Sequence, residues 1–372
     1  MLLNFNFINL RLNANIYYTC CVKHTSKPVI PCSFVPIFAE TDGGLHLFRM
    51  IYVELPVEKN RRLPFYLAME EYIAREFPAQ DYFFIWQVEP TVIFGRNQLI
   101  DSEVDVAFCR ANGIQFYRRK SGGGCVFADR SNLMLSYITP ATNVNFTFNR
   151  YMLMVEDALQ RLGIDAKTSG RNDILIDGKK VSGNAFYHLP GRSIVHGTML
   201  YDTNLDYMLN ATTPSATKLR SKGVESVRQH ITTLCNHINI TIEELKEHLR
   251  SVLCDGAIVL SAADVTAIER LEQEYYDDSF IFGNNPAATL AKIQRIEGVG
   301  EFHVSVDVKE NRIRKVSLAG DFFIVGDLNS MLLNKLNGVE YNRAAIENVL
   351  ADVDTGDIIM NLKKEELINL LI

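Results

Sequence analysis

Hydrophobic and polar residues follow different periods along the chain, and each period predicts a type of element. In residues 64–77, apolar side chains recur every three or four positions, which is the spacing of one helix face. Residues 149–162 show the same spacing and end at Gly163, and glycine is common just after a helix. The same criteria predict further helices at 103–112, 241–253, 263–277, 327–337, 342–351 and 363–370.

Runs rich in β-branched and aromatic residues predict strands between these helices. Residues 83–88 and 91–95 are two such runs joined by a Glu-Pro pair, and they predict a hairpin. An Asp-Gly pair at 177 and 178 favours a tight hairpin turn inside a longer β meander. The remaining strands are predicted at 50–55, 113–118, 125–129 and 132–138, and within 173–201 and 301–320.

Strands and helices are mixed without a regular βαβ alternation, which favours an α+β fold with a largely antiparallel sheet over a parallel, doubly wound sheet. The chain of 372 residues is long enough for two domains. Helix-breaking residues near Gly283 to Pro286 predict a boundary between a large domain, 50–285, and a small one, 286–372. Residues 1–49 are apolar but interrupted by asparagines. We interpret them as an N-terminal extension, either a disordered leader or a start placed too early.

Charge and cysteine usage narrow the class of protein. The net charge is -6 and the pI is about 5.8, so the chain lacks the basic balance of a nucleic-acid-binding protein, and any cationic site must be local. The chain contains no run of 18 or more apolar residues, so the sequence predicts no membrane-spanning helix. The seven cysteines form no CxxC pair, which is typical of reduced thiols in a cytoplasmic protein.

A cluster of cations beside three glycines is the most unusual local feature. Residues 118–127 read RRKSGGGCVF and lie between two predicted strands, unlike a Walker loop or a dinucleotide fingerprint, both of which open a helix. Glycines lack a Cβ and let backbone N–H groups approach a ligand closely. With Arg118 and Arg119 beside it, the loop predicts a site for an anion. A tight β connection with solvated cations remains the alternative.

A second candidate segment covers residues 170–185 (GRNDILIDGKKVSGNA). Strand alternation places Lys179 and Lys180 on opposite faces, and a lysine that points inward is costly unless it meets an anion. Lys180 is therefore a candidate ligand for a phosphate or carboxylate, with an exposed hairpin lysine as the alternative. Asn172 and Asp173 are typical of a turn, and Asp173 is also of the type that binds Mg²⁺.

Two further segments carry polar groups, in a strand around His196 and in a basic stretch at residues 218–234. His196 interrupts an apolar strand, where a histidine bonded within the core is the usual explanation. Residues 218–234 contain five basic side chains, which suit a loop that closes over phosphate or an ordinary solvated loop. The five basic side chains are Lys218, Arg220, Lys222, Arg228 and His230.

Cys125, in the glycine-rich segment, is interpreted as a packing residue, since no separate feature indicates an activating base.

Taken in this order and spacing, these segments resemble the lipoate protein ligases, which share a superfamily with the biotin ligases. Similar agreement is found in LAMEEYI (67–73), in FFIWQVEPTVIFGRNQ (83–98) and in GDFF (320–323), so that the likeness extends from about Met50 to the end. Ala128, Ser131 and Val195 depart from the family pattern, as does Leu99. The resemblance implies a large catalytic domain with a mainly antiparallel sheet, followed by a small C-terminal α+β accessory domain.

The resemblance also implies a two-step reaction. The carboxylate of lipoate attacks the α-phosphorus of ATP in the presence of Mg²⁺, and a lysine amine of an acceptor protein then attacks the resulting lipoyl-AMP. The acceptors implied are apo lipoyl domains of 2-oxoacid dehydrogenase complexes or the glycine cleavage H protein, with no nucleic acid or membrane involved. An ATP-independent octanoyl or lipoyl transferase and a non-catalytic lipoate-binding paralogue are the alternatives.

Position by position, the resemblance implies roles for individual residues. Lys180 would be catalytic and would contact both lipoate and ATP. Asp173 would also bind Mg²⁺. The implied ATP-binding residues are Arg119, Gly124, Cys125, Val126, Phe127, Asn172 and Asp173, and the implied lipoate-binding residues are Ser121, Gly122, Gly123 and His196.

Overall fold

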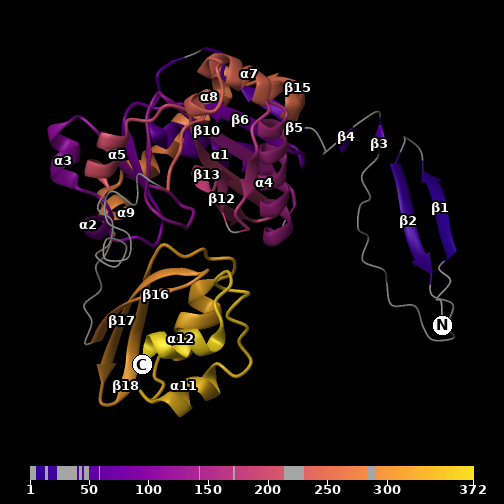
Figure 1. Cartoon of the computed structure of the whole chain (residues 1–372). Coiled ribbons are helices and arrows are strands. Elements are labelled where there is room, and N and C mark those ends of the chain that lie inside the picture. The colour runs from indigo at the N-terminus through magenta and orange to yellow at the C-terminus, as the bar shows by residue number, and fades with distance from the viewer. Residues whose placement is uncertain are drawn as a thin grey trace. The chain divides into compact units, whose positions relative to one another are not determined.

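The computed structural model describes residues 6–12, 16–22, 40–41, 44–45, 50–57, 59–141, 143–170, 172–212, 230–283 and 290–372. These residues belong to two compact units, Met1–Arg49 and Met50–Ile372. In the first unit, strand β1 (Asn6–Leu12) pairs antiparallel with β2 (Ile16–Val22), and the short strands β3 (Glu40–Thr41) and β4 (Gly44–Leu45) also pair (Figure 1).

The second unit is built on an eight-stranded sheet in the order β11-β12-β13-β14-β10-β6-β5-β15. Every neighbouring pair is antiparallel except β5 with β6 and β5 with β15. The strands are β5 (Met50–Glu54), β6 (Tyr82–Trp86), β10 (Asn132–Thr139), β11 (Ala166–Thr168), β12 (Asp173–Ile176), β13 (Lys179–Leu189), β14 (Arg192–Leu200) and β15 (Cys254–Val259). The predicted α+β class with a mainly antiparallel sheet is confirmed.

The predicted hairpin between residues 83–88 and 91–95 is wrong. Strand β6 lies between β5 and β10 in the large sheet, whereas β7 (Thr91–Phe94) is the middle strand of a separate sheet of order β8-β7-β9. Both edges of β6 are already paired, so β7 has no free edge to join. The sequence pattern identified both strands but could not show which partners they take. The outer strands of this small sheet are β8 (Gln115–Arg118) and β9 (Val126–Ala128).

Helices cover both faces of the large sheet. Ser136 of β10 donates a hydrogen bond to Glu70 of α1 (Leu63–Glu76), and the next residue, Tyr137, stacks on Tyr151 of α4 (Val144–Gln160). Because adjacent residues of a strand point to opposite faces, α1 and α4 lie on opposite sides of the sheet. All eight residues of β10 are buried, which explains why apolar residues occupy both of its faces instead of alternating with polar ones.

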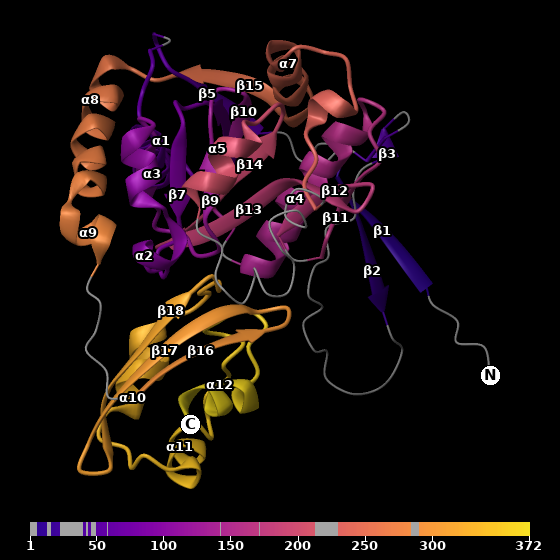
Figure 2. The same ribbon diagram turned by 60° about the vertical axis from the view of Figure 1, so that its left-hand side comes forward.

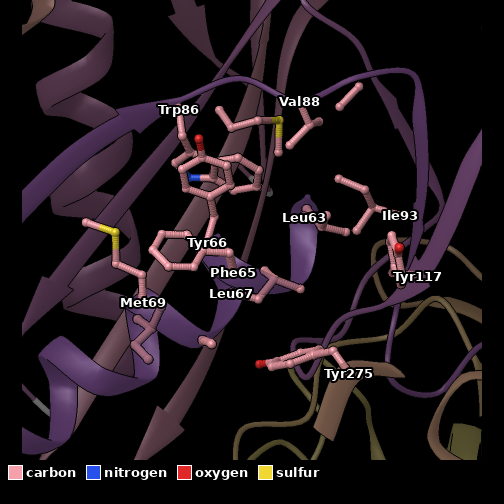
Figure 3. Packing of buried hydrophobic residues seen from close by; sticks show 14 of the residues in the cluster. Leu63, Phe65, Tyr66, Leu67, Met69, Trp86, Val88, Ile93, Tyr117 and Tyr275 are labelled. Atoms are coloured by element: carbon pink, nitrogen blue, oxygen red, sulfur yellow. The ribbon is translucent and has the colours of Figure 1, made fainter. Parts of the chain in front are cut away.

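The apolar face of α1 forms the centre of the core in this unit. Figure 3 shows Leu63, Tyr66 and Leu67 directed from α1 toward Trp86 of β6 and Ile93 of β7. The rings of Tyr66 and Trp86 stack with centroids 4.7 Å apart. This packing joins the large sheet to the small one. Since β7 also lies between β8 and β9, it positions the glycine segment that connects them.

The other helices predicted in this part of the chain are present, with shifts at their ends, but α5 (Leu205–Ala211) and α9 (Asp278–Phe282) were not predicted. The predicted helix at 149–162 begins earlier, at Val144, and the predicted helix at 263–277 ends in a tighter 3₁₀ turn, Glu272–Tyr276. No helix among the described residues is both long and apolar enough to cross a bilayer. These helices are α2 (Ile100–Glu103), α3 (Val106–Ala111), α5 (Leu205–Ala211), α7 (Ile242–Leu253), α8 (Ala262–Leu271) and α9 (Asp278–Phe282), with a short 3₁₀ turn at Leu234–Asn236.

The C-terminal part has its own sheet and its own hydrophobic core. Strands β16 (Leu290–Ile296), β17 (Gly300–Lys309) and β18 (Arg312–Gly320) form an antiparallel sheet, and α12 (Lys364–Leu371) packs on β16 and β17 (Figure 2). A π-helical turn (Asn329–Leu333), α10 (Asn334–Leu336) and α11 (Arg343–Val349) complete it. Most of the proposed domain boundary near 283–286 lies outside the described residues.

Candidate active site

A cavity whose empty space, open solvent included, is about 550 Å³ lies where α1, the glycine loop (residues 119–125) and strands β13 and β14 meet. One part of its lining is apolar and includes Leu63, Leu67, Trp86 and Met134. The other part is polar and includes the backbone of the glycine loop and the side chains Asn172, Lys180 and Asn184. The cavity therefore combines a place for an aliphatic group with a place for a charged group.

The glycine loop, residues 119–125, is held by close backbone contacts. It joins β8 to β9, as predicted, and Gly123 has the positive φ of 85° that glycine adopts most readily. The Ser121 carbonyl accepts from the Arg96 N–H at 2.9 Å. At Gly95, an added Cβ would lie only 2.2 Å from the Gly123 carbonyl oxygen. The segment after β7 and the loop can thus pack together only because a glycine stands at position 95.

Arg118 does not line the cavity, and its side chain makes hydrogen bonds that connect two segments of the protein. Its Nε donates to the carbonyls of Phe280 and Ile281, and its Nη1 donates to the carbonyls of Gly95 and Gln98, at 2.6 to 3.2 Å. Burial lowers the pKa of the guanidinium to about 10, so the group stays charged at neutral pH. The first arginine of the cationic cluster therefore ties α9 to the segment that follows β7.

Arg119 lines the cavity but also organises the loop from within. Its Nε donates to Ser121 Oγ at 2.9 Å, its Nη1 to the Ile93 carbonyl at 3.0 Å, and its Nη2 to the carbonyls of Gly122 and Gly124 at 2.7 Å each. These bonds use four of its five N–H groups. Burial lowers its pKa to about 10. One N–H and the positive charge remain for a ligand.

Lys180 lies on the cavity lining, whereas Lys179 is exposed. The Lys180 ammonium lies 2.7 Å from Asp173 Oδ1, and the Lys180 side chain is 35% exposed to solvent. Its backbone N–H donates to the His230 carbonyl at 2.8 Å, and its carbonyl accepts from the Thr232 N–H at 2.9 Å. The C-terminal end of the predicted cationic loop is thus anchored beside this lysine.

Other predicted residues of that region fall outside the described part of the chain. These are Lys218, Arg220, Lys222 and Arg228. Arg171, which precedes Asn172, is also outside it.

Asn172 and Asp173 stand next to this ion pair. Asn172 exchanges hydrogen bonds of 3.1 Å with Asn184, side chain to backbone in both directions. Asp173 Oδ1 is buried, and its ion pair with Lys180 is the contact that satisfies it. Among the described residues, no group of three or more His, Cys, Asp or Glu side chains could hold a metal ion. The described residues offer one carboxylate beside Lys180, that of Asp173, which suits a cation shared with substrate phosphates.

Ser121 and His196 belong to a buried polar network. Ser121 Oγ lies 2.7 Å from His196 Nε2, and His196 Nδ1 lies 2.9 Å from Glu70 Oε2. His196 lines the cavity, whereas Ser121 lies behind the lining. Sequence reasoning missed Glu70. A signal was present, because Glu70 lies three residues after Leu67 and three before Ile73, on the face that the helical period assigns to the core.

The middle of the glycine loop contacts the C-terminal part of the chain. The Gly123 N–H donates to the Phe322 carbonyl at 3.3 Å. A Cβ at Gly122 would lie 2.6 Å from that oxygen, and one at Gly123 would lie 2.9 Å from the Phe323 ring. Phe323 also stacks on Phe186 of β13, with centroids 5.5 Å apart. Two glycines expected to face lipoate therefore also make room for the GDFF segment.

The last predicted residues lie where β9 begins. Gly124, Cys125 and Val126 line the cavity, and each is half-buried. Phe127 points into the hydrophobic core and is 2% exposed. Alternation along β9 accounts for this difference between Val126 and Phe127.

Comparison with known proteins gives matches over most of the chain. Residues 63–253 match the family model of the lipoyl protein ligase A/B catalytic domain, and residues 285–371 match that of the bacterial lipoate protein ligase C-terminus. Lipoate-protein ligase LplJ of Bacillus subtilis is 33% identical over 317 residues, which cover 82% of this chain and 95% of that protein.

Solved structures show the same fold. The crystal structure of P. falciparum LipL1 in complex with lipoate superposes with a TM-score of 0.68 at 19% identity, covering 86% of this chain and 97% of that one. The crystal structure of lipoate-protein ligase A bound with ATP gives a TM-score of 0.55 at 23% identity, covering 63% and 99%.

The family models and the Bacillus subtilis relative therefore define the chain as a protein ligase. Within this class, the chain belongs to the lipoate protein ligase family.

Proposed function

We propose that this chain activates lipoate with ATP and transfers the lipoyl group to a lysine of an acceptor protein. The observation that carries the proposal is the position of Lys180. Its ammonium lines the same cavity as the backbone of Gly123 and Gly124 and as the apolar side chains around Trp86. A carboxylate that enters with its aliphatic tail against the apolar lining would meet this ammonium, and so would a phosphate on the glycine loop.

The first step brings two anions together, and the site is built to offset their repulsion. A fixed positive charge stabilises the charge that develops when a carboxylate attacks phosphorus. The ammonium of Lys180 is a compact point charge on a flexible stem, which suits a position between two anions. The guanidinium of Arg119 supplies a second charge and one remaining N–H. In this proposal, Lys180 contacts both reactants, and the backbone from Gly124 to Phe127 contacts the nucleotide.

The apolar lining provides affinity for the tail of lipoate. Each buried CH₂ contributes about 0.8 kcal/mol of transfer free energy. Leu63, Leu67 and Met134 supply such a surface without polar groups that would discriminate between tails. The stacked pair Tyr66 and Trp86 gives this part of the cavity a rigid wall.

Mg²⁺ fits the site as a partner of the phosphates. Asp173 would hold it as a carboxylate ligand, although its Oδ1 also pairs with Lys180, and bound Mg²⁺ would neutralise part of the phosphate charge. Asn172 could add an amide oxygen. Loss of the carboxylate should therefore raise the Mg²⁺ concentration that the enzyme needs.

The acceptors that we propose are apo lipoyl domains of 2-oxoacid dehydrogenase complexes and the glycine cleavage H protein. The test combines the protein with ATP, Mg²⁺, lipoate and an apo lipoyl domain, and follows the acceptor by intact mass. We expect the mass to increase by one lipoyl group. Omission of ATP distinguishes the ligase from a transferase between carrier proteins, because a transferase would act on a lipoylated donor without ATP.

Two adjacent lysines provide a matched comparison for this assay. Lys180→Ala should abolish the mass increase, whereas Lys179→Ala, which changes the exposed neighbour, should leave it unchanged. Lipoate that binds without pyrophosphate release would contradict the ligase proposal and indicate a binding protein. A fully active Lys180→Ala variant would remove this residue from the mechanism.

A further inference from the structure

A continuous chain of buried polar groups runs behind the cavity, and the reaction above does not use most of it. Arg119 Nε is bonded to Ser121 Oγ at 2.9 Å, Ser121 Oγ to His196 Nε2 at 2.7 Å, and His196 Nδ1 to Glu70 Oε2 at 2.9 Å. Of these side chains, Ser121 and Glu70 are 0% exposed, Arg119 is 4% exposed and His196 is 6% exposed. The chain connects helix α1 to the glycine loop through strand β14.

A second branch reaches the same carboxylate from the other side. Trp86 Nε1 donates to Ser136 Oγ at 2.8 Å, and Ser136 Oγ donates to Glu70 Oε1 at 2.6 Å. The two serines occupy equivalent places in the two branches. Each is 0% exposed, and each joins an obligatory donor to the chain that ends at Glu70.

The direction of every hydrogen bond follows from the groups at the ends. A guanidinium and an indole N–H can only donate, and an ionised carboxylate can only accept. Ser121 Oγ therefore accepts from Arg119 and gives its own proton to His196 Nε2. His196 must then carry its proton on Nδ1 and donate it to Glu70. In this arrangement His196 Nε2 carries no proton, because a proton there would leave the Ser121 hydroxyl without an acceptor in the chain.

We propose that Glu70 and His196 are positioning residues that hold the glycine loop in its nucleotide-binding conformation. They act through Ser121, whose hydroxyl orients the guanidinium of Arg119. The guanidinium then fixes the carbonyls of Gly122 and Gly124. Gly123 and Gly124, which these bonds hold in place, line the cavity. The inference rests on the proposed function, since it assigns the loop to ATP.

The same geometry resembles a Ser-His-acid triad, but it does not make Ser121 a nucleophile. Ser121 is fully buried and lies behind the cavity lining, so a substrate carbonyl has no access to Oγ. One lone pair of Oγ is also engaged by Arg119 Nε. A role in position rather than in covalent chemistry is what this environment supports.

The two serines offer a matched test by lipoate-dependent ATP–pyrophosphate exchange. Ser121→Ala breaks the branch to the loop, and we expect it to raise the KM for ATP about tenfold with little change in the KM for lipoate. Ser136→Ala removes a serine of equal burial from the other branch, and it should leave the KM for ATP unchanged. Equal effects of the two variants on the KM for ATP would overturn the proposal, because they would indicate general loss of core stability.

A charge-neutral change at the carboxylate adds a second kinetic test. In Glu70→Gln, the amide nitrogen can turn toward His196 Nδ1, which would shift the ring proton to Nε2 and interrupt the chain at Ser121, where Arg119 and His196 would both donate. We expect the KM for ATP to rise as it does in Ser121→Ala, with thermal unfolding confirming a folded protein. An unchanged KM for ATP in a folded Glu70→Gln variant would overturn the role of Glu70.

The tautomer gives a readout that does not depend on activity. A long-range ¹H–¹⁵N spectrum of the whole protein separates protonated from unprotonated ring nitrogens, and His196→Gln identifies the signals of His196. We expect Nδ1 to be protonated and Nε2 to be unprotonated in the unaltered protein. Protonated Nε2 there would overturn the relay even if the enzyme is active. If the spectrum agrees but no pyrophosphate exchange occurs, the proposed function fails and the relay stands as a structural feature.

Discussion

The ammonium of Lys180 lies where a side chain on Gly183 would be. A Cβ added at Gly183 would stand 2.6 Å from Lys180 Nζ and 2.7 Å from its Cε. Strand β13 therefore carries a lysine whose stem crosses the bare backbone three residues further along. The absence of a side chain at 183 is what lets the amine reach Asp173 and the cavity.

Gly183→Ala should reduce catalysis with little effect on folding. The added methyl meets only the end of a flexible side chain, so the free energy of unfolding should change by less than about 1 kcal/mol. The ammonium must move, and a displacement of this kind can lower kcat about a hundredfold. Steady-state kinetics and urea unfolding of the same preparation measure both quantities. Gly256→Ala, where nothing lies within 4 Å of the new Cβ, serves as the control.

Gly95→Ala, unlike Gly183→Ala, should lower the stability of the protein strongly. Here the new Cβ would meet backbone, 2.2 Å from the Gly123 carbonyl oxygen, and the backbone cannot turn aside as a lysine can. We expect the free energy of unfolding to fall by about 3 kcal/mol, as overpacking of this severity costs. Urea unfolding measures it, again beside Gly256→Ala. A midpoint equal to that of the control would show that the loop and residue 95 are not in contact.

Arg118→Lys should destabilise the protein although it keeps the charge. A lysine cannot reproduce the planar set of donors that meets the carbonyls of Gly95, Gln98, Phe280 and Ile281. Buried carbonyls left without donors should cost about 3 kcal/mol in the free energy of unfolding. The same change at the exposed Arg110 should be neutral in a parallel unfolding experiment.

His188 should make the protein less stable as the pH falls below 6.5. Burial lowers the pKa of this imidazole, whose Nδ1 lies 2.9 Å from Ser193 Oγ and whose Nε2 has no hydrogen-bond partner. As pH decreases through the ordinary value, the unfolded chain binds a proton before the folded chain does. Protonation therefore favours the unfolded state, and stability is lost toward acid pH.

Urea unfolding midpoints at several pH values below 6.5 check this expectation. His188→Gln removes the titrating group, so its stability should decrease less steeply with falling pH than that of the unaltered protein. Parallel pH profiles for the two proteins would assign the acid loss of stability to other groups.

Much of the fold could be predicted because local patterns encode it. The helical period around Tyr66 placed α1 correctly, and the Asp-Gly turn at 177 and 178 adopts the positive φ values, 50° and 74°, that favour this pair in hairpins. The same patterns failed for β6 and β7, since a strand's own sequence does not specify which edge it joins. They also gave no indication of β1 and β2, whose residues show no clear alternation.

Sequence patterns also predicted several residues of the candidate site, but not all of the contacts that those residues make. Strand alternation and the cost of burying an amine predicted that Lys179 and Lys180 have different surroundings, and the structure places one outside and the other at the cavity. The motif also identified Arg118 and Arg119 as a cationic cluster. It could not show that both guanidinium groups are largely used by backbone carbonyls, because those carbonyls belong to segments up to 163 residues away in the chain.

The sequence by itself determined the type of each element and the kinds of residue available for chemistry, since periodicity and turn preferences act between near neighbours. Tertiary structure decided which of those residues meet. Glu70 and His196 are 126 positions apart, and only the packing of α1 on β14 joins them. Contacts over such distances depend on how sheets and helices close around one core, and local sequence carries no record of that closure.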